Sequence, residues 1–161
     1  MTSPDGAGLV RDARAWRSPI AWLVLLCTFA AGLSFDLWTK YWSFEHVAPE
    51  PVVLTPGQLV EDPDYRLPWH PGVEVVPPDL LDFHLVLNRG AVFGIGQHRR
   101  GVFIALTVVA VCAGLAVFAG WTDRRSRLSH IAIGLVLAGG VGNLYDRYVY
   151  GAVRDFLHML P

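Results

Sequence analysis

Charged residues avoid three stretches of this 161-residue chain almost completely. No Asp, Glu, Lys or Arg lies within residues 19–35, 101–122 or 131–145. A helix of roughly 20 apolar residues crosses a hydrocarbon core about 30 Å thick. The pattern therefore predicts three membrane-spanning helices, over residues 18–38, 101–121 and 128–146.

The first apolar run has an alternative explanation as a cleaved secretory signal. Basic residues precede it, at Arg11, Arg14 and Arg17. However, the run continues past Asp36 into an aromatic cluster of Trp38, Tyr41 and Trp42. Such clusters are typical of the membrane interface. A secretory signal has a shorter apolar region, so we favour a spanning helix.

Composition supports the membrane class and excludes several others. Apolar residues make up 53% of the chain and charged residues only 17%, against roughly 25% charged in soluble domains. The net charge of −1 gives no field that would attract nucleic acid. Cys27 and Cys112 lie inside apolar runs without a CxxC spacing, and the histidines are scattered. We therefore predict no disulfide framework, no metal site and no nucleic-acid partner.

Basic residues flanking the apolar runs predict the orientation. The N-terminal segment carries three arginines, and a short link carries Arg124, Arg125 and Arg127. Residues 39–100 carry five basic side chains against eight acidic ones. The positive-inside tendency then places the N terminus in the cytoplasm and residues 39–100 on the opposite side of the membrane. Arg99 and Arg100 argue mildly for the opposite orientation.

The connection between the first two helices has its own pattern. Residues 45–78 are rich in proline and acidic residues and show no helical period, which predicts an irregular segment over the membrane face. Residues 80–88 alternate as a strand does, and a glycine-rich turn at 89–96 follows. The predicted fold is an all-α integral membrane helix bundle, one domain over 1–161, with a small extracytoplasmic β-containing segment.

Small residues form a stripe on the third predicted helix. The stripe consists of Gly134, Ala138, Gly142 and Asp146, at four-residue steps on one face. Such a face lets another helix approach closely, and here it directs Asp146 into the contact. Asn143 is within helical reach of both Asp146 and Arg147. A simpler interpretation stays open, in which the stripe is a packing groove closed by a surface pair of Asp146 and Arg147.

Polar residues also gather at one predicted membrane boundary. Asp36 and Lys40 are spaced for an ion pair on one helix face, although taken alone a snorkelling lysine with a paired aspartate is the better explanation for them. Four polar residues map to the same outer boundary, namely Asp36, Asn88, Asp146 and Asp155. Ionisable groups at a membrane are costly, so this coincidence indicates a functional site.

The motifs around these residues match a known family in order. They are DLWTK at 36–40, NRGAVFG at 88–94, GGVGNLYDR at 139–147 and GAVRDF at 151–156. The chain resembles the bacterial lipoprotein signal peptidase family, signal peptidase II. The first motif is weak alone, whereas the last two together are highly specific.

The resemblance implies a four-helix membrane aspartic peptidase without a cofactor. Its substrate is a prolipoprotein whose lipobox cysteine carries a diacylglyceryl group, and it removes the signal peptide at the membrane. Asp155 would be one carboxylate of the catalytic pair. The resemblance assigns supporting or substrate-orienting roles to the remaining motif residues: Asp36, Lys40, Asn88, Gly90, Asn143, Asp146 and Arg147.

The sequence departs from the family after Asp155. The family's second catalytic aspartate lies in an Asn-x-Ala-Asp motif at the start of a fourth helix, but residues 156–161 contain no acidic residue. The chain is then a truncated copy, an inactive relative, or an enzyme that pairs Asp146 with Asp155. Arg147 beside Asp146 argues against the last. We expect this chain alone not to cleave, and a non-catalytic membrane scaffold or assembly partner is the alternative function.

Overall fold

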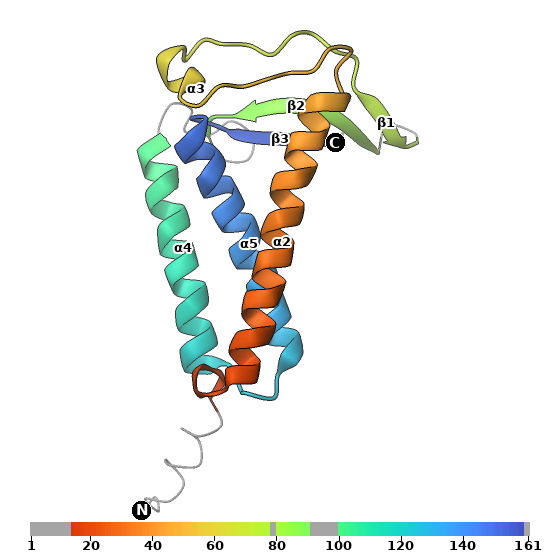
Figure 1. Ribbon diagram of the computed structural model, residues 1–161. Helices are drawn as coiled ribbons and strands as arrows, with labels where there is room; N and C mark the ends of the chain where they lie inside the picture. The colour runs from red at the N-terminus through yellow and green to blue at the C-terminus, as the bar shows by residue number, and fades with distance from the viewer. Residues whose placement is uncertain (1–13, 78–79, 91–99, 160–161) are drawn as a thin grey trace, which may run out of the picture. The chain divides into compact units, whose positions relative to one another are not determined.

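The computed structural model describes residues 14–77, 80–90 and 100–159 (Figure 1). The elements are a short 3-10 helix η1 (Ala15–Arg17), helices α2 (Pro19–His46), α3 (Gln58–Glu61), α4 (Arg100–Trp121) and α5 (Arg127–Val149), and strands β1 (Val73–Val76), β2 (Leu81–Asn88) and β3 (Val153–His158). They form two compact units. The helical unit comprises Met1–Ser34 and Thr107–Val141, and the sheet unit comprises Phe35–Leu106 and Gly142–Pro161.

Three helices are long and apolar enough to cross a membrane: α2, α4 and α5. Their outward faces carry large apolar side chains, such as Leu23 on α2, Val109 on α4 and Val136 on α5, each more than half exposed. A helix in water would turn these side chains inward, whereas hydrocarbon accepts them. The described residues therefore contain the three long apolar helices that the sequence predicts, as a membrane helix bundle requires.

The helical unit packs around a small apolar core. Its buried members are Ala15, Ala21, Leu25, Phe118 and Leu137. A Cβ added at Gly134 would lie 3.0 Å from the carbonyl oxygen of Leu25, and one added at Gly32 would lie 3.0 Å from the Cβ of Ala138. The small residues of α5 therefore let α2 approach closely, and the predicted packing face is confirmed.

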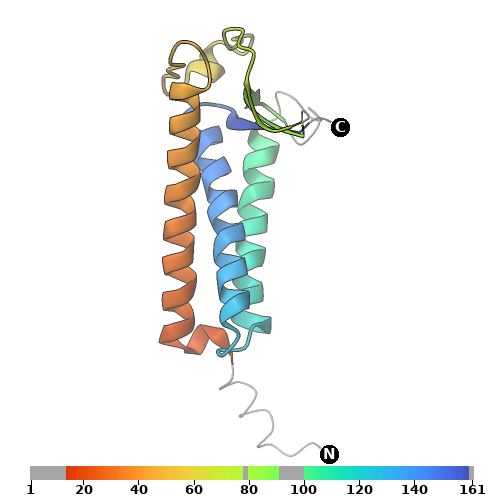
Figure 2. The same ribbon diagram turned by 90° about the vertical axis from the view of Figure 1, so that its right-hand side faces the viewer.

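The sheet unit contains an antiparallel sheet in the order β1-β2-β3 (Figures 1 and 2). In the β2–β3 pairing, Val86 lies opposite Asp155 and Asn88 lies opposite Val153. Only β2 was expected from the sequence. Strands β1 and β3 are additional, and β1 and α3 lie inside residues 45–78, so that segment is less irregular than predicted. Of the predicted glycine-rich turn, residues 91–96 lie outside the described residues.

Helix α2 ends at His46 rather than at residue 38 as predicted. Its last turn contributes Phe44 to the core of the sheet unit, which also contains Val47, Ala48, Val52 and Leu85. Partly buried Phe83 and Phe156, from β2 and β3, pack against this core. Apolar contact with the sheet thus favours helix beyond the aromatic cluster, where the sequence pattern alone suggested an interface.

A tight turn connects α5 to β3. Gly151 has φ +101°, a backbone conformation that side-chain-bearing residues rarely adopt. The amides of Tyr150 and Gly151 both donate to the carbonyl oxygen of Asp146, at 2.8 and 3.3 Å. This turn reverses the chain at the end of α5 and brings β3 back beside the residues of the GNLYDR motif.

Candidate active site

Asp146 is the centre of an ion-pair network within the sheet unit. Its side chain is fully buried. Arg154 on β3 donates to Oδ1 through Nε at 3.0 Å and Nη2 at 2.8 Å, and its backbone amide donates to Oδ2 at 3.2 Å. A bidentate pair of this kind fixes both partners. The network therefore ties the end of α5 to β3.

Lys40 extends this network to α2. Its Nζ lies 2.9 Å from Oδ2 of Asp36 and 3.3 Å from Oδ2 of Asp146, and it donates to Oδ1 of Asn143 at 2.9 Å. The lysine is only 4% exposed. The predicted Asp36–Lys40 pair is confirmed, and it is part of a larger cluster rather than a snorkelling pair. Two acidic and two basic side chains balance one another here, as buried charges require.

The interpretation that Asp146 and Arg147 form a surface ion pair is wrong. Asp146 is buried, and its ionic partners are Arg154 and Lys40. Arg147 instead donates to the carbonyl oxygen of Gly90 at 3.1 Å and lies over the ring of Phe103. Neighbours in sequence on α5 are about 100° apart around a helix, which is why the two side chains face different partners.

Asp155 and Asn88 lie together on neighbouring strands. The Asn88 side chain donates a hydrogen bond to the Asp155 carboxylate, while its Oδ1 accepts from the backbone amide of Gly90 at 3.0 Å. Burial raises the pKa of Asp155 above its ordinary value of 3.8; the Asn88 hydrogen bond and the charges of Lys40 and Arg147 partly oppose that rise. A carboxyl that holds its proton to higher pH can serve as an acid.

The structure brings all the sequence-predicted site residues into the sheet unit. Asp36, Lys40, Asn143 and Asp146 form one cluster, Asn88 and Asp155 form a second, and Arg147 joins Gly90. The attraction of Lys40 and Arg147 for Asp155 links these groups electrostatically. Raised pKa values near fixed charges are a feature of catalytic sites.

Two arginines were missed as site residues by the sequence reasoning. Arg154 lies inside the GAVRDF motif, yet nothing in its spacing identifies Asp146 as its partner. Arg100 begins α4 and donates to the carbonyl oxygens of Arg147 and Tyr148 at 2.6 and 2.9 Å. These hydrogen bonds satisfy the last carbonyl groups of α5, and because Arg100 is 47 residues from Arg147 no local spacing predicts them.

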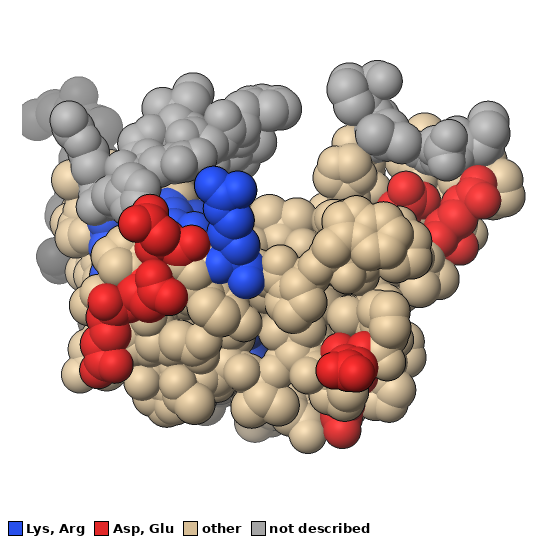
Figure 3. All heavy atoms as spheres, turned by 90° about the horizontal axis from the view of Figure 1, so that it is seen from above, with Lys and Arg blue, Asp and Glu red and all other residues tan. Residues whose placement is uncertain are grey.

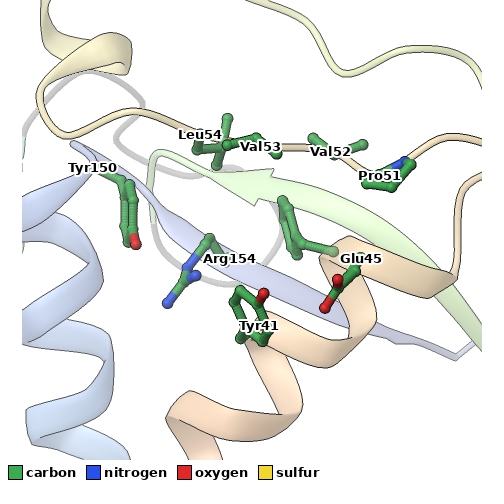
Figure 4. Close-up of a pocket in the computed structure, with 9 residues that line it drawn as sticks. Tyr41, Glu45, Pro51, Val52, Val53, Leu54, Tyr150 and Arg154 are labelled. Carbon is green, nitrogen blue, oxygen red and sulfur yellow. The ribbon is translucent and has the colours of Figure 1, made fainter.

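A small cavity of about 140 Å³ adjoins Arg154 on β3 (Figure 4). Residues Pro51–Leu54 cross above it, while Tyr41 and Glu45 face it from α2. The Arg154 guanidinium lies 4.3 Å from the ring centroid of Tyr150. Successive strand residues point to opposite faces, so this cavity lies on the other side of β3 from Asp155.

Seen from above in Figure 3, acidic side chains lie in separate groups, with basic side chains and uncharged or histidine residues between them. Among the residues that the structure describes, no group of three His, Cys, Asp or Glu side chains is arranged to hold a metal ion. What the described side chains offer is acid–base chemistry, through one half-buried carboxyl beside an amide and two cations.

Comparison with known proteins identifies the family to which these residues belong. The family model described as "Signal peptidase (SPase) II" matches residues 28–161. The chain belongs to the signal peptidase II family. All the residues of both clusters lie within the matched range. The prediction of this family from the sequence motifs is confirmed.

Relatives and solved structures agree with the signal peptidase II assignment. A lipoprotein signal peptidase of Methylorubrum extorquens is 32% identical over 90% of this chain and 70% of its own length. One of Symbiobacterium thermophilum is 37% identical over 57% of this chain, which spans 59% of that relative. A bacterial membrane enzyme solved in meso at 2.3 Å has a TM-score of 0.59 and 22% identity, over 92% of this chain and 74% of that one, and so shares the fold.

Proposed function

We propose that this chain is a membrane aspartic endopeptidase that removes signal peptides from diacylglyceryl-modified prolipoproteins, with Asp155 as one catalytic carboxylate. The observation that carries the proposal is the environment of Asp155. Its carboxyl is half-buried and accepts a hydrogen bond from Asn88. The positive charges of Lys40 and Arg147 attract it, and burial raises its pKa. In a signal peptidase II family member, this is the carboxyl best suited to acid–base work.

The chemistry requires two carboxylates in different protonation states. The ionised member takes a proton from the attacking water, while the protonated member polarises the scissile carbonyl. The raised pKa of Asp155 suits it to the protonated role before attack. It then gives up this proton, and the partner carboxylate holds the one taken from water.

Neither Asp36 nor Asp146 is suited to be that partner. Asp146 receives hydrogen bonds from Arg154 and an ion pair from Lys40, and both favour its ionised form. Asp36 is already paired with Lys40. We propose that both aspartates position the helix ends, and that Asp155 acts with a carboxylate from the Asn-x-Ala-Asp segment that the family carries. The 161-residue polypeptide by itself is then expected not to cleave.

The supporting residues have separable roles in this proposal. Asn88 fixes the Asp155 carboxylate through its amide, and Arg147 holds the Gly90 carbonyl beside it. Lys40 and Asn143 hold α2 against α5. The arginine-rich link at 124–127 favours a cytoplasmic location for that end, and with it an extracytoplasmic site. A lipid-anchored cysteine then stays in the bilayer while the peptide bond meets water.

The test is a gel-shift assay of a diacylglyceryl prolipoprotein in proteoliposomes. A hybrid that carries the segment after Asp155 from the Methylorubrum extorquens relative is expected to convert the substrate. Asp155→Asn in the hybrid should abolish conversion, because the general acid is lost. Asp64→Asn, which removes an exposed carboxylate in the same unit, should not change it.

Three outcomes would overturn parts of this proposal. Equal conversion by the D155N hybrid would refute the role of Asp155. Conversion by residues 1–161 alone, lost in D155N, would refute the need for a further carboxylate. An inert hybrid that inserts normally would favour a scaffold role. For orientation, single cysteines at Asp64 and Ser126 in a C27A/C112A background should react with an impermeant maleimide from outside only at position 64.

A further inference from the structure

An arginine-lined pocket lies in the helical unit, apart from the residues that the peptidase proposal uses. Its lining residues are Ser18, Ile20, Arg124, Arg125 and Arg127, around a volume of about 430 Å³. Ser18 immediately precedes α2, and the three arginines come from the link between α4 and α5. We propose that this pocket binds the phosphate of an anionic membrane phospholipid.

Charge is the first argument for an anionic ligand. The side chains of Arg124, Arg125 and Arg127 form no ion pair with a carboxylate among the residues that the structure describes. The nearby acidic residue, Asp123, uses Oδ1 to accept from the backbone amide of Arg125 at 2.8 Å. Three arginines thus line one opening, with a single carboxylate close by in the sequence. Arginine presents planar donors that suit phosphate oxygens.

The second argument is that backbone contacts hold the wall of the pocket in place. The backbone amide of Ala15 donates to the carbonyl oxygen of Thr122 at 2.9 Å, which joins η1, just before α2, to the start of the arginine link. The buried His130 donates from Nε2 to the carbonyl oxygen of Asp123 at 3.1 Å. When the wall of a site is already ordered, binding loses less conformational entropy.

The third argument distinguishes a phospholipid from a free phosphate ion. Large apolar side chains at the pocket are strongly exposed: Ile20, which lines it, is 62% exposed, and Trp121 and Leu128, which flank the arginines in sequence, are 78% and 79% exposed. A free phosphate leaves these side chains without an apolar neighbour. A phospholipid offers a charged headgroup and acyl chains together, which matches a basic pocket beside apolar helix surface.

The experiment measures lipid binding to the purified 161-residue chain by native mass spectrometry. Phosphatidylglycerol is expected to bind more tightly than phosphatidylcholine. The triple variant R124Q/R125Q/R127Q should lose about a hundredfold in phosphatidylglycerol affinity, and each single variant about fivefold. Arg66→Gln, an exposed arginine of the sheet unit, is the matched control and should bind as the wild type does.

Each other outcome overturns the proposal. Equal affinity for the two lipids, or an unchanged triple variant, would show that the arginines do not select a headgroup. Displacement of phosphatidylglycerol by inorganic phosphate at millimolar concentration, on the scale of cellular phosphate, would identify the free ion as the ligand. If the triple glutamine variant does not insert, the single variants decide, because each retains two of the three charges. The lipid readout is independent of peptidase activity.

Discussion

Replacing Asp146 with asparagine tests the ion-pair network directly. The change keeps the size of the side chain and one acceptor oxygen but removes the negative charge. Arg154 and Lys40, which are 7% and 4% exposed, would then be left as buried cations with only Asp36 to balance them. The folded state is therefore expected to lose much more stability than it would at an ordinary surface pair.

The structure sets the size of the effect. Asp146 is fully buried, accepts three hydrogen bonds from Arg154 and pairs with Lys40. Removing one partner of a buried ion pair costs about 3–5 kcal/mol. Asp36→Asn is the matched control. Its side chain is 27% exposed and has a single ion pair, so its loss should cost about 1 kcal/mol.

The assay is reversible unfolding in mixed micelles with increasing dodecyl sulfate, followed by tryptophan fluorescence. D146N is expected to lower the free energy of unfolding by about 3 kcal/mol or more. Adding Arg154→Gln to D146N should restore part of this loss, because the buried guanidinium is removed with its partner. A D146N loss no larger than that of D36N would refute the reasoning, as would strictly additive effects in the double variant.

Three further predictions concern packing and pH. Gly142→Ala should lower the free energy of unfolding by about 1–3 kcal/mol in the same assay, because the added Cβ meets the Asp36 carboxylate, whereas Gly139→Ala, with open space, should not. Burial raises the pKa of Asp155 above 3.8. The stability that the protonated carboxyl contributes to the folded state is therefore fully present below pH 3.8 and is lost as the pH rises through the raised pKa. The unfolding free energy of D155N minus that of wild type should therefore grow with pH over this range, and a flat difference would contradict it. Burial and the neighbouring His70 and His158 lower the pKa of His84 from 6.5, and Asp82 partly opposes this effect. The stability that neutral His84 contributes to the folded state is therefore fully present above pH 6.5 and is lost as the pH falls through the lowered pKa. His84→Gln should flatten the acid side of the stability profile, and an unchanged slope would contradict this.

Local spacing predicted the features whose partners lie within one helix or follow from its faces. The charge-free runs predicted the three long helices, and the four-residue steps through Gly134 and Ala138 predicted the close approach of another helix. The Asp36–Lys40 pair follows from helical geometry alone. In each case the period of the element carries the information, so no knowledge of the tertiary fold is needed.

The sequence pattern could not predict contacts between residues of different elements. The partner of Asp146 is Arg154, which reaches it only because the chain reverses at Gly151 and forms β3 beside β2. The sequence analysis could only offer Arg147, the adjacent cation, as an open alternative, because the positive φ of the turn cannot be read from one glycine. Similarly, β1 and β3 are short strands whose stability comes from pairing with β2.

If the proposed peptidase function holds, the length of α2 makes bilayer thickness a determinant of the activity of the complete site. At 1.5 Å per residue, Lys40 lies about 32 Å along the helix from Pro19, close to one hydrocarbon thickness. The cluster of Lys40, Asp36 and Asp146 would thus lie at the level where acyl chains give way to headgroups. Lipids with longer chains would impose hydrophobic mismatch met by local thinning of the bilayer, and lipids with shorter chains would impose one met by helix tilt. Proteolysis should consequently be fastest over a narrow range of acyl-chain lengths.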